Sequence, residues 1–203
     1  MPDFELEEAA RKRGFKFICG VDEAGRGPLA GPVCAAAVIF PEYCIIEGIN
    51  DSKKLSEKKR EELFKAITEN AVSYCVAYGS LEEIEELNIL ETTFIAMKRA
   101  VDGLKIPADF AIIDGNRTPK NFEIPCQTVV KGDSKSLSVA AASILAKVSR
   151  DRLMLEYDER YPQYGFKKHK GYGTKEHIEK ILEFGPSEIH RLSFLGKILG
   201  EQP

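Results

Sequence analysis

Three apolar runs, far apart in the sequence, each lead into carboxylate side chains. The first run spans 17–21 and precedes Asp22 and Glu23, the second spans 110–113 and precedes Asp114, and the third spans 128–132 and precedes Asp133. A run that stops at an acid is typical of a buried strand that carries its last side chain to the edge of a sheet. If the strands are neighbours, the four acids converge, and carboxylates about 4 Å apart repel by roughly 4 kcal/mol at an effective dielectric near 20. We therefore expect a site for divalent cations at this edge.

The chain has 203 residues, of which 43% are hydrophobic, enough for one substantial core. The first dozen residues contain no apolar signal region, and the longest apolar stretch, 33–40, is too short to span a bilayer. The five cysteines are odd in number and unpaired in spacing, which favours reduced thiols over a disulfide framework or a cysteine-based zinc site. We expect a protein of the cytoplasm without membrane contact.

The net charge is only −3, but the charge is unevenly distributed. Segments 51–60 and 167–180 each carry five basic residues against two acidic ones, whereas 82–91 carries five acids and no base. This pattern is compatible with a phosphate-binding face on an acidic protein, but any single run of this kind is more typical of a solvated helix face.

Alternation and capping patterns predict the secondary structure. In chain order they predict a strand at 17–21, a strand at 33–40, a helix at 56–69, a strand at 71–78, helices that begin at Ser80 and Asn88, strands at 110–113 and 128–132, an alanine-rich packing helix at 136–157 and a helix at 174–184. This order indicates an α/β fold with a mixed central sheet flanked by helices and a small helical C-terminal annex. We expect a core over 1–160, with a basic loop and the annex over 161–203 packed on it.

A glycine-rich loop, 25–32, follows the first acidic pair. Its spacing is not that of the dinucleotide-binding fingerprint, and it lacks the Gly-Lys-Ser/Thr of ATPase phosphate loops. The loop can form a tight hairpin between two strands. It can also let the backbone approach a bound polymer while Arg26 reaches a phosphate, and the two roles are compatible.

The segment 20–33, Gly-Val-Asp-Glu-Ala-Gly-Arg-Gly-Pro-Leu-Ala-Gly-Pro-Val, resembles the opening signature of bacterial ribonuclease HII. Further matches follow in the family's order: 50–55, 114–116, 131–133, 140–144, 147–148 with 150–151, 169–172 and 190–194. Together they cover nearly the whole chain, and the combination is very specific.

This resemblance implies a ribonuclease H-like fold and an endonuclease that cuts the RNA strand of RNA/DNA hybrids. It also implies cleavage at single ribonucleotides in duplex DNA, and hence ribonucleotide excision in DNA repair. The family's four acids fall on the acids at the ends of the apolar runs, its Gly-Arg-Gly element on Gly25, Arg26 and Gly27, and its junction-sensing tyrosine on Tyr172. Type HIII relatives typically have Gly-Lys-Gly, a glutamate as fourth acid and an extra N-terminal domain, so Arg26, Asp133 and the short leader favour type HII.

Oxygen ligands favour Mg²⁺ or Mn²⁺ over zinc, and the histidines, His169, His177 and His190, all lie in the C-terminal part of the sequence. We expect two ions during catalysis, with Asp22 bridging them, and products with 5′-phosphate and 3′-hydroxyl ends. Adjacent acids on a strand point to opposite faces, which is a difficulty for pairing Asp22 with Glu23. We expect the strand to have ended at Glu23, so that its side chain turns back.

Substrate recognition is expected to read the ribose 2′-hydroxyl through the Gly25–Gly27 backbone, with Tyr172 stacking on a sugar or base. Tyr172 could instead be a simple surface turn residue. Four lysines are candidates for phosphate contacts: Lys53, Lys54, Lys168 and Lys170.

Two other functions remain open at this point. One is a nuclease of the same superfold with another substrate, such as a DNA junction resolvase or an exonuclease; the other is a non-catalytic nucleic-acid-binding module. We expect a monomer that binds RNA/DNA hybrid and ribonucleotide-containing duplex DNA. We expect no long tail past Pro203 to carry a clamp-binding peptide, and whether a replication clamp or another protein recruits the enzyme stays open.

Overall fold

A five-stranded sheet lies at the centre of the molecule, which the computed structural model describes over residues 1–44, 46–119 and 122–200. Its strands are β1 (Ile18–Ala24), β2 (Val33–Ile39), β3 (Ser73–Gly79), β4 (Phe110–Asp114) and β5 (Cys126–Val129). They are ordered β3-β2-β1-β4-β5; β1 pairs antiparallel with β2 and β2 with β3, whereas β1–β4 and β4–β5 are parallel. The predicted mixed sheet is therefore confirmed.

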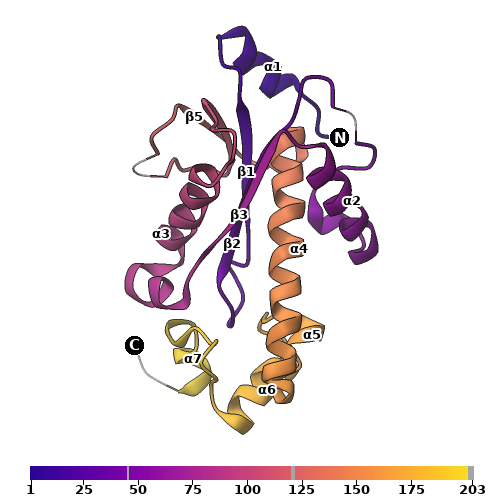
Figure 1. The fold of residues 1–203 in the computed structure, drawn as a ribbon. Helices are drawn as coiled ribbons and strands as arrows, with labels where there is room; N and C mark the ends of the chain where they lie inside the picture. Colours follow the sequence, from indigo (N-terminus) through magenta and orange to yellow (C-terminus); the bar gives the residue numbers. More distant parts are fainter. Residues whose placement is uncertain (45, 120–121, 201–203) are drawn as a thin grey trace.

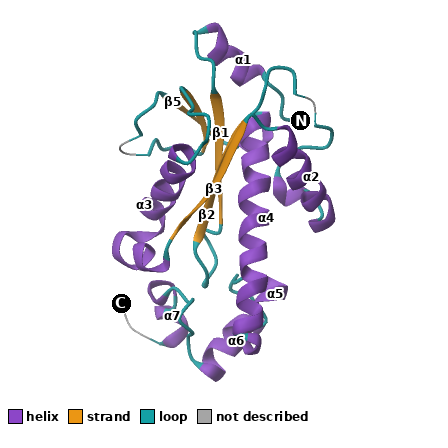
Figure 2. Cartoon of the chain, in the orientation of Figure 1, coloured by secondary structure: helices purple, strands orange, loops and turns teal. Residues whose placement is uncertain are grey.

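Seven helices in the described residues cover this sheet and extend beyond it. They are α1 (Glu5–Lys12), α2 (Glu57–Asn70), α3 (Leu81–Asp102), α4 (Leu137–Arg160), α5 (Phe166–His169), α6 (Lys175–Phe184) and α7 (Gly196–Leu199). Helices α4 and α2 pack on one face of the sheet and α3 on the other (Figures 1 and 2). Each face therefore has its own hydrophobic core, and no described helix is long and apolar enough to cross a bilayer.

The alanine-rich helix α4 packs very close to the sheet, as predicted. Ser136 caps its N-terminus by accepting a hydrogen bond from the N–H of Val139, and Ala140, Ala141 and Ala142 are fully buried. At Gly20 of β1, an added Cβ would lie 2.1 Å from the backbone carbon of Ser138. Small residues on both elements therefore allow the contact that brings α4 over the acidic end of β1.

Helix α3 confirms the two predicted caps. Ser80 and Glu83 form a capping box, and Asn88 has φ of 73° inside the helix, where its side chain accepts hydrogen bonds from the N–H groups of Leu90 and Glu91. Asn tolerates the left-handed region better than most residues, so α3 consists of a short and a long part joined at this kink.

Two local expectations were wrong, and one helix was not predicted. Strand β1 runs to Ala24 rather than ending at Glu23, because its pairing with β2 continues to Ala24 opposite Cys34. Strand β5 ends at Val129, before Lys131 adopts a left-handed conformation with φ of 56°, so Asp133 lies in a 3₁₀ turn, Gly132–Ser134. Helix α1 was not predicted; its buried Glu7 bonds to the N–H of Ser138, a contact that no local pattern reveals.

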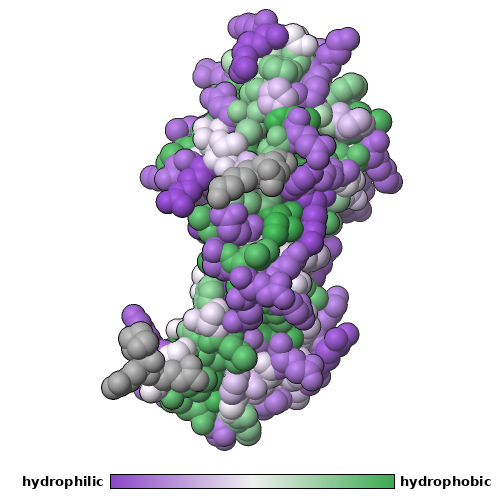
Figure 3. Space-filling model, turned by 90° about the vertical axis from the view of Figure 1, so that its left-hand side faces the viewer, coloured by the Kyte–Doolittle hydropathy of each residue, from purple (hydrophilic) through white to green (hydrophobic). Residues whose placement is uncertain are grey.

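The C-terminal elements pack on the end of α4 and on the glycine-rich loop. Ala30 forms a β-bridge with His190, and it shares an apolar cluster with Met154, Phe166 and Ile189. These elements form the lower lobe of an elongated molecule that narrows above them (Figure 3). The boundary at residue 160 stays a prediction, and residues 201–203 of the predicted annex lie outside the described residues.

Candidate active site

Asp22 is a buried carboxylate on the face of β1 that packs against α4. It pairs with Ala36 of β2, is only 5% exposed, and accepts a 2.7 Å hydrogen bond from the N–H of Glu23 at Oδ1. Burial raises its pKa well above the usual range, and the charges of Glu23 and Asp114 raise it further. A side-chain contact with Ser143 of α4 only partly offsets this. Asp22 therefore sits where its negative charge is poorly compensated.

Glu23 follows on the opposite face of β1, as the continued strand requires. Its Oε1 lies 3.3 Å from Nη1 of Arg26, yet burial outweighs this ion pair and raises the pKa of Glu23, with a further contribution from Asp114. A cavity of about 330 Å³ opens beside it, lined by Glu23, Arg26, Asp114 and side chains of α3. The charge of Glu23 nevertheless raises the pKa of Asp22, and the charge of Asp114 raises the pKa of both acids.

The remaining two acids are joined through one turn. Asp114 is the last residue of β4, one position past the pairing of Ile113 with Val21. Its Oδ1 accepts a 2.6 Å hydrogen bond from the N–H of Gly132, next to Asp133. Asp133 is 8% exposed, and its pKa is raised by burial and then by Asp51 and Asp114. Distant segments thus bring all four predicted acids into one electrostatically coupled region.

The four acids offer the oxygen ligands that the predicted divalent ions prefer. In the described part of the chain, no three His, Cys, Asp or Glu side chains are grouped closely enough to hold a metal ion as they stand. The chemistry of the set nevertheless fits: the donors are carboxylate oxygens, and burial and mutual repulsion raise the pKa of Asp22, Glu23 and Asp133. A hard cation would relieve that repulsion. The role of these acids as metal ligands stays a prediction.

Lys53 is the predicted lysine that lies beside the acids. Burial lowers its pKa, but the surrounding carboxylates outweigh this effect, so the pKa of Lys53 is raised overall. The carboxylates are those of Asp22, Asp133, Asp51 and Asp114. The position follows from the 3₁₀ turn Ser52–Lys54, whose capping residue Asp51 accepts a hydrogen bond from the N–H of Lys53.

Asp51 was missed as a site residue. Its charge raises the pKa of Asp133, and its side chain caps the turn that carries Lys53. The sequence offered one indication of this role, the position of Asp51 in the Asn-Asp-Ser-Lys-Lys segment. Asp51 entered the prediction only as one of the acidic residues in the charge of segment 51–60.

The other three predicted lysines have partners of their own. Lys54 pairs with Asp51 at 3.8 Å, Lys168 pairs with Glu176 at 2.7 Å, and Nζ of Lys170 donates to the carbonyl of Lys167. None of these contacts reaches the four acids. Their phosphate contacts stay predictions.

The glycine-rich loop and Tyr172 lie together, as a shared recognition surface requires. A Cβ added at Gly27 would have Cε1 of Tyr172 as its nearest neighbour, at 3.9 Å. Tyr172 is 44% exposed, and Nζ of Lys147 lies 6.0 Å from the centre of its ring. Arg26 is exposed beside Glu23. These residues could contact a polymer that reaches the acids.

Two buried arginines support this loop, and the sequence reasoning assigned them no role. Arg191 donates to four carbonyls of the loop, and Arg150 donates to two more and to the carbonyl of Lys170. Their only signal in the sequence was their presence in segments 147–151 and 190–194, which take part in the family resemblance.

The three histidines form a buried hydrogen-bonded cluster. His190 accepts from the N–H of Ser187 at Nδ1, so its Nε2–H donates to Nε2 of His177 at 3.1 Å, and Nδ1–H of His177 donates to the carbonyl of Tyr172. His169 stacks on His177 with ring centres 4.3 Å apart. Burial lowers the pKa of His177 and His190 to about 4. These neutral rings hold the backbone of Tyr172.

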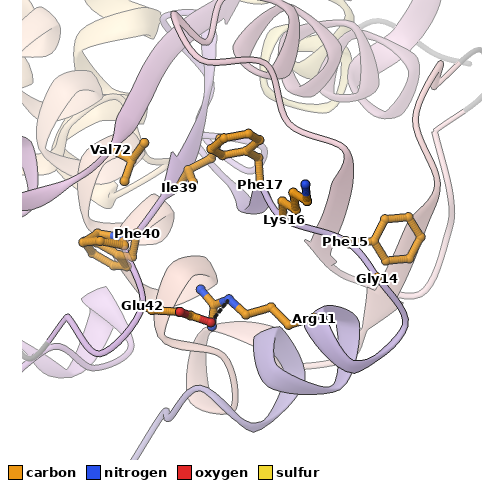
Figure 4. Close-up of a pocket in the computed structure, with 10 residues that line it drawn as sticks. Arg11, Gly14, Phe15, Lys16, Phe17, Ile39, Phe40, Glu42 and Val72 are labelled. Atoms are coloured by element: carbon orange, nitrogen blue, oxygen red, sulfur yellow. Dashed lines mark ion pairs between the residues drawn. The ribbon is translucent and has the colours of Figure 1, made fainter.

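A larger cavity, about 550 Å³, lies at the opposite end of the sheet (Figure 4). Its lining includes Phe17, just before β1, and Ile39, the last residue of β2, with an ion pair of 3.6 Å between Arg11 and Glu42. The acids lie at the other end of β1, so this cavity is separate from the candidate site.

Comparisons with known proteins agree with this arrangement. The family model "Ribonuclease HII" matches residues 19–197. A ribonuclease HII from Caldicellulosiruptor saccharolyticus is 57% identical over 196 residues, covering 97% of this chain and 95% of the relative. The ribonuclease H2 structure from Pyrococcus horikoshii is similar with a TM-score of 0.74 and 29% identity, over 90% of this chain and 97% of that one. The structure of the PCNA:RNase HII complex from Archaeoglobus fulgidus is similar with a TM-score of 0.71 and 26% identity. The match covers 87% of this chain and 94% of that one. The fold is thus ribonuclease H-like, and the chain belongs to the ribonuclease HII family of endoribonucleases.

Proposed function

We propose that this endoribonuclease hydrolyses the RNA strand of RNA/DNA hybrids and cuts duplex DNA at single ribonucleotides, leaving 5′-phosphate and 3′-hydroxyl ends. The observation that carries the proposal is the coupling of four carboxylates at one edge of the sheet, beside the glycine-rich loop and Tyr172. We further propose that the enzyme acts as a monomer in the cytoplasm, in ribonucleotide excision during DNA repair.

The acids would hold Mg²⁺ or Mn²⁺. Two such ions, when bound, would lower the pKa of the attacking water and stabilise charge on the leaving oxygen. Asp22 interacts with both Glu23 and Asp114 and is the most buried of the four acids, so we assign it as the shared ligand. Glu23, Asp114 and Asp133 complete the set. Lys53 places a positive charge next to these acids, where a substrate phosphate would arrive.

Recognition of RNA would use the exposed side of the loop. The 2′-hydroxyl both donates and accepts hydrogen bonds, and it distinguishes a ribonucleotide from its DNA neighbours. Backbone groups of Gly25 and Gly27 would contact it, Arg26 would bind a flanking phosphate, and Tyr172 would stack on the adjoining sugar or base. The loop lies close to the acids, because Arg26 of the loop forms an ion pair with Glu23.

The test uses a DNA duplex with one ribonucleotide and the same duplex made only of DNA. We expect cleavage of the first alone, in Mg²⁺ or Mn²⁺ but not in EDTA, with 5′-phosphate and 3′-hydroxyl ends. Cleavage of both duplexes would favour a junction or DNA nuclease. Cyclic phosphate ends would contradict hydrolysis by water, and metal-independent cutting would contradict the assignment of the acids.

A further inference from the structure

We propose that Arg191, together with Arg150, is a positioning residue that orients the backbone of the glycine-rich loop 25–32 for recognition of the ribonucleotide. The proposal rests on the proposed function, because it takes the exposed side of this loop as the surface that contacts the 2′-hydroxyl. The proposal also explains what orients the loop: the side chains of Arg150 and Arg191, which come from the C-terminal part of the chain.

The guanidinium of Arg191 is fully buried beneath the loop and uses all its nitrogens on backbone carbonyls. Its hydrogen bonds run from Nε to Gly31, from Nη1 to Arg26 and Pro28, and from Nη2 to Gly25 and Gly31, at 2.6–2.9 Å. No carboxylate forms an ion pair with it within the described residues. A buried cation without an acidic partner costs stability, so its carbonyl bonds to the loop are its main compensation.

These bonds fix the direction of the loop's peptide units. In a planar trans peptide the C=O and the N–H point in opposite directions. Because the carbonyls of Gly25 and Arg26 point at Arg191, the N–H groups of Arg26 and Gly27 point away from it. Neither N–H has a hydrogen-bond partner in the described part of the chain. The loop therefore presents two adjacent free donors on the side that carries the exposed Arg26 side chain.

Arg150 joins the same loop to the segment that carries Tyr172. Its Nε donates to Pro32 and its Nη2 to Ala30, while Nη1 donates to the carbonyl of Lys170 at 3.0 Å. Gly25, with φ of +94°, packs on this side chain so closely that an added Cβ would lie 2.0 Å from Nε of Arg150. The two arginines thus hold the backbone that carries the free donors and the backbone two residues before Tyr172.

Lysine cannot replace this arrangement. Arginine offers five N–H groups in a rigid planar fork, whereas lysine offers three on one atom. An ammonium at position 191 would keep the charge but leave some of the four carbonyls without a donor. The loop would then be free to turn its peptide units, with the acids untouched.

The experiment measures binding in EDTA, so that no cleavage occurs, to a duplex with one ribonucleotide and to the all-DNA duplex of the same sequence. We expect wild type to prefer the first, and Arg191→Lys to lose that preference by about tenfold, the loss of one or two charge-assisted hydrogen bonds. Affinity for the all-DNA duplex should stay within about twofold, since phosphate contacts dominate it. Arg152→Lys is the matched control, because Arg152 is exposed on α4 and pairs with Glu61.

A merely structural role would lower the unfolding temperature of Arg191→Lys and leave the binding preference unchanged, and that result would overturn the proposal. If Arg191→Lys does not fold, Arg150→Lys is measured in the same way, with a smaller loss expected, and an unchanged preference again overturns it. A wild-type protein that shows no preference would contradict the proposed function itself, so the two failures are distinguishable.

Discussion

The backbone N–H of Gly132 donates a 2.6 Å hydrogen bond to Oδ1 of Asp114. This bond ties the end of β4 to the turn that carries Asp133. Only a small residue fits there, because an added Cβ would lie 3.4 Å from Oδ1 of Asp114 and 3.2 Å from Cγ1 of Val139.

Gly132→Ala should therefore lower the cleavage rate by about tenfold or more, since a shift below 1 Å at a reacting group is costly. The overall fold should survive, because the neighbours need to move by only a few tenths of an ångström. Single-turnover rates and thermal unfolding, measured on the same samples, separate the two effects. A normal rate would mean that the Asp114–Gly132 contact has no part in catalysis.

Asp22→Asn should abolish metal-dependent cleavage and stabilise the metal-free protein by about 1 kcal/mol at pH 7. The sign follows from the raised pKa: burial and the charges of Glu23 and Asp114 disfavour the ionised form in the folded state. Mg²⁺ or Mn²⁺ should raise the unfolding temperature of wild type but not of the variant. Calorimetry with and without EDTA measures both quantities.

The matched control for that experiment is Asp102→Asn, since Asp102 is an exposed acid on α3 that pairs with Lys98. It should keep both the activity and the stabilisation by cations. Residual cleavage near the wild-type rate in Asp22→Asn would end the catalytic assignment of this acid.

Lys53→Ala should weaken substrate binding and reduce the slope of log affinity against log salt by about one unit, as expected for one lost phosphate contact. Burial lowers the pKa of its ammonium, but the charges of Asp22, Asp133 and Asp51 outweigh this and raise it. Lys65→Ala is the control, because Lys65 is exposed on α2 and pairs with Glu69. The slope is measured by titration at several salt concentrations, and an unchanged slope in Lys53→Ala would remove this lysine from the binding surface.

Gly20→Ala should destabilise the fold by about 2–4 kcal/mol or prevent folding, because its methyl group would overlap the α4 backbone at Ser138. Chemical denaturation measures this free energy. A stable variant would show that α4 can move away from β1 at little cost, which would weaken the argument that small residues position the acidic edge.

Much of this fold follows from local patterns. The apolar runs before Asp22 and Asp114 are strands because their side chains are buried on both faces, and Ser80, Asn88 and Ser136 begin helices because their oxygens satisfy free N–H groups. Position 133 could be marked as an acid near the sheet edge, but not as part of a 3₁₀ turn. That turn depends on the left-handed backbone of Lys131, which a lysine does not signal.

Contacts between residues far apart in the chain could not be predicted from the sequence. Glu7 and Arg191 make hydrogen bonds to residues more than 120 positions away, and their spacing carries no periodic signal. The continuation of β1 to Ala24 likewise depends on its partner strand. Residues that act by bonding to backbone carbonyls, as Arg150 does, are recognisable only once the fold brings those carbonyls together.

The pair His177–His190 should make the protein sensitive to acid. Both are neutral in the fold, with pKa values lowered from 6.5 to about 4 by burial. The unfolded chain then binds more protons than the folded one between these values, so the free energy of unfolding falls as pH drops from about 6.5 to 4, by up to about 1.4 kcal/mol per pH unit for each histidine. Protonation of His177 at Nε2 would also break the bond between the two rings, whereas its Nδ1–H would still donate to the carbonyl of Tyr172.

The check is denaturant unfolding at pH 7, 6, 5 and 4 for wild type and for His177→Gln/His190→Gln. The double variant should be less stable at pH 7 and show a shallower loss of the free energy of unfolding toward pH 4. Asp22 and Glu23, whose pKa values are raised, act in the opposite sense, but they are present in every variant and cancel in the difference. Equal slopes in wild type and the double variant would show that the two rings do not govern acid unfolding.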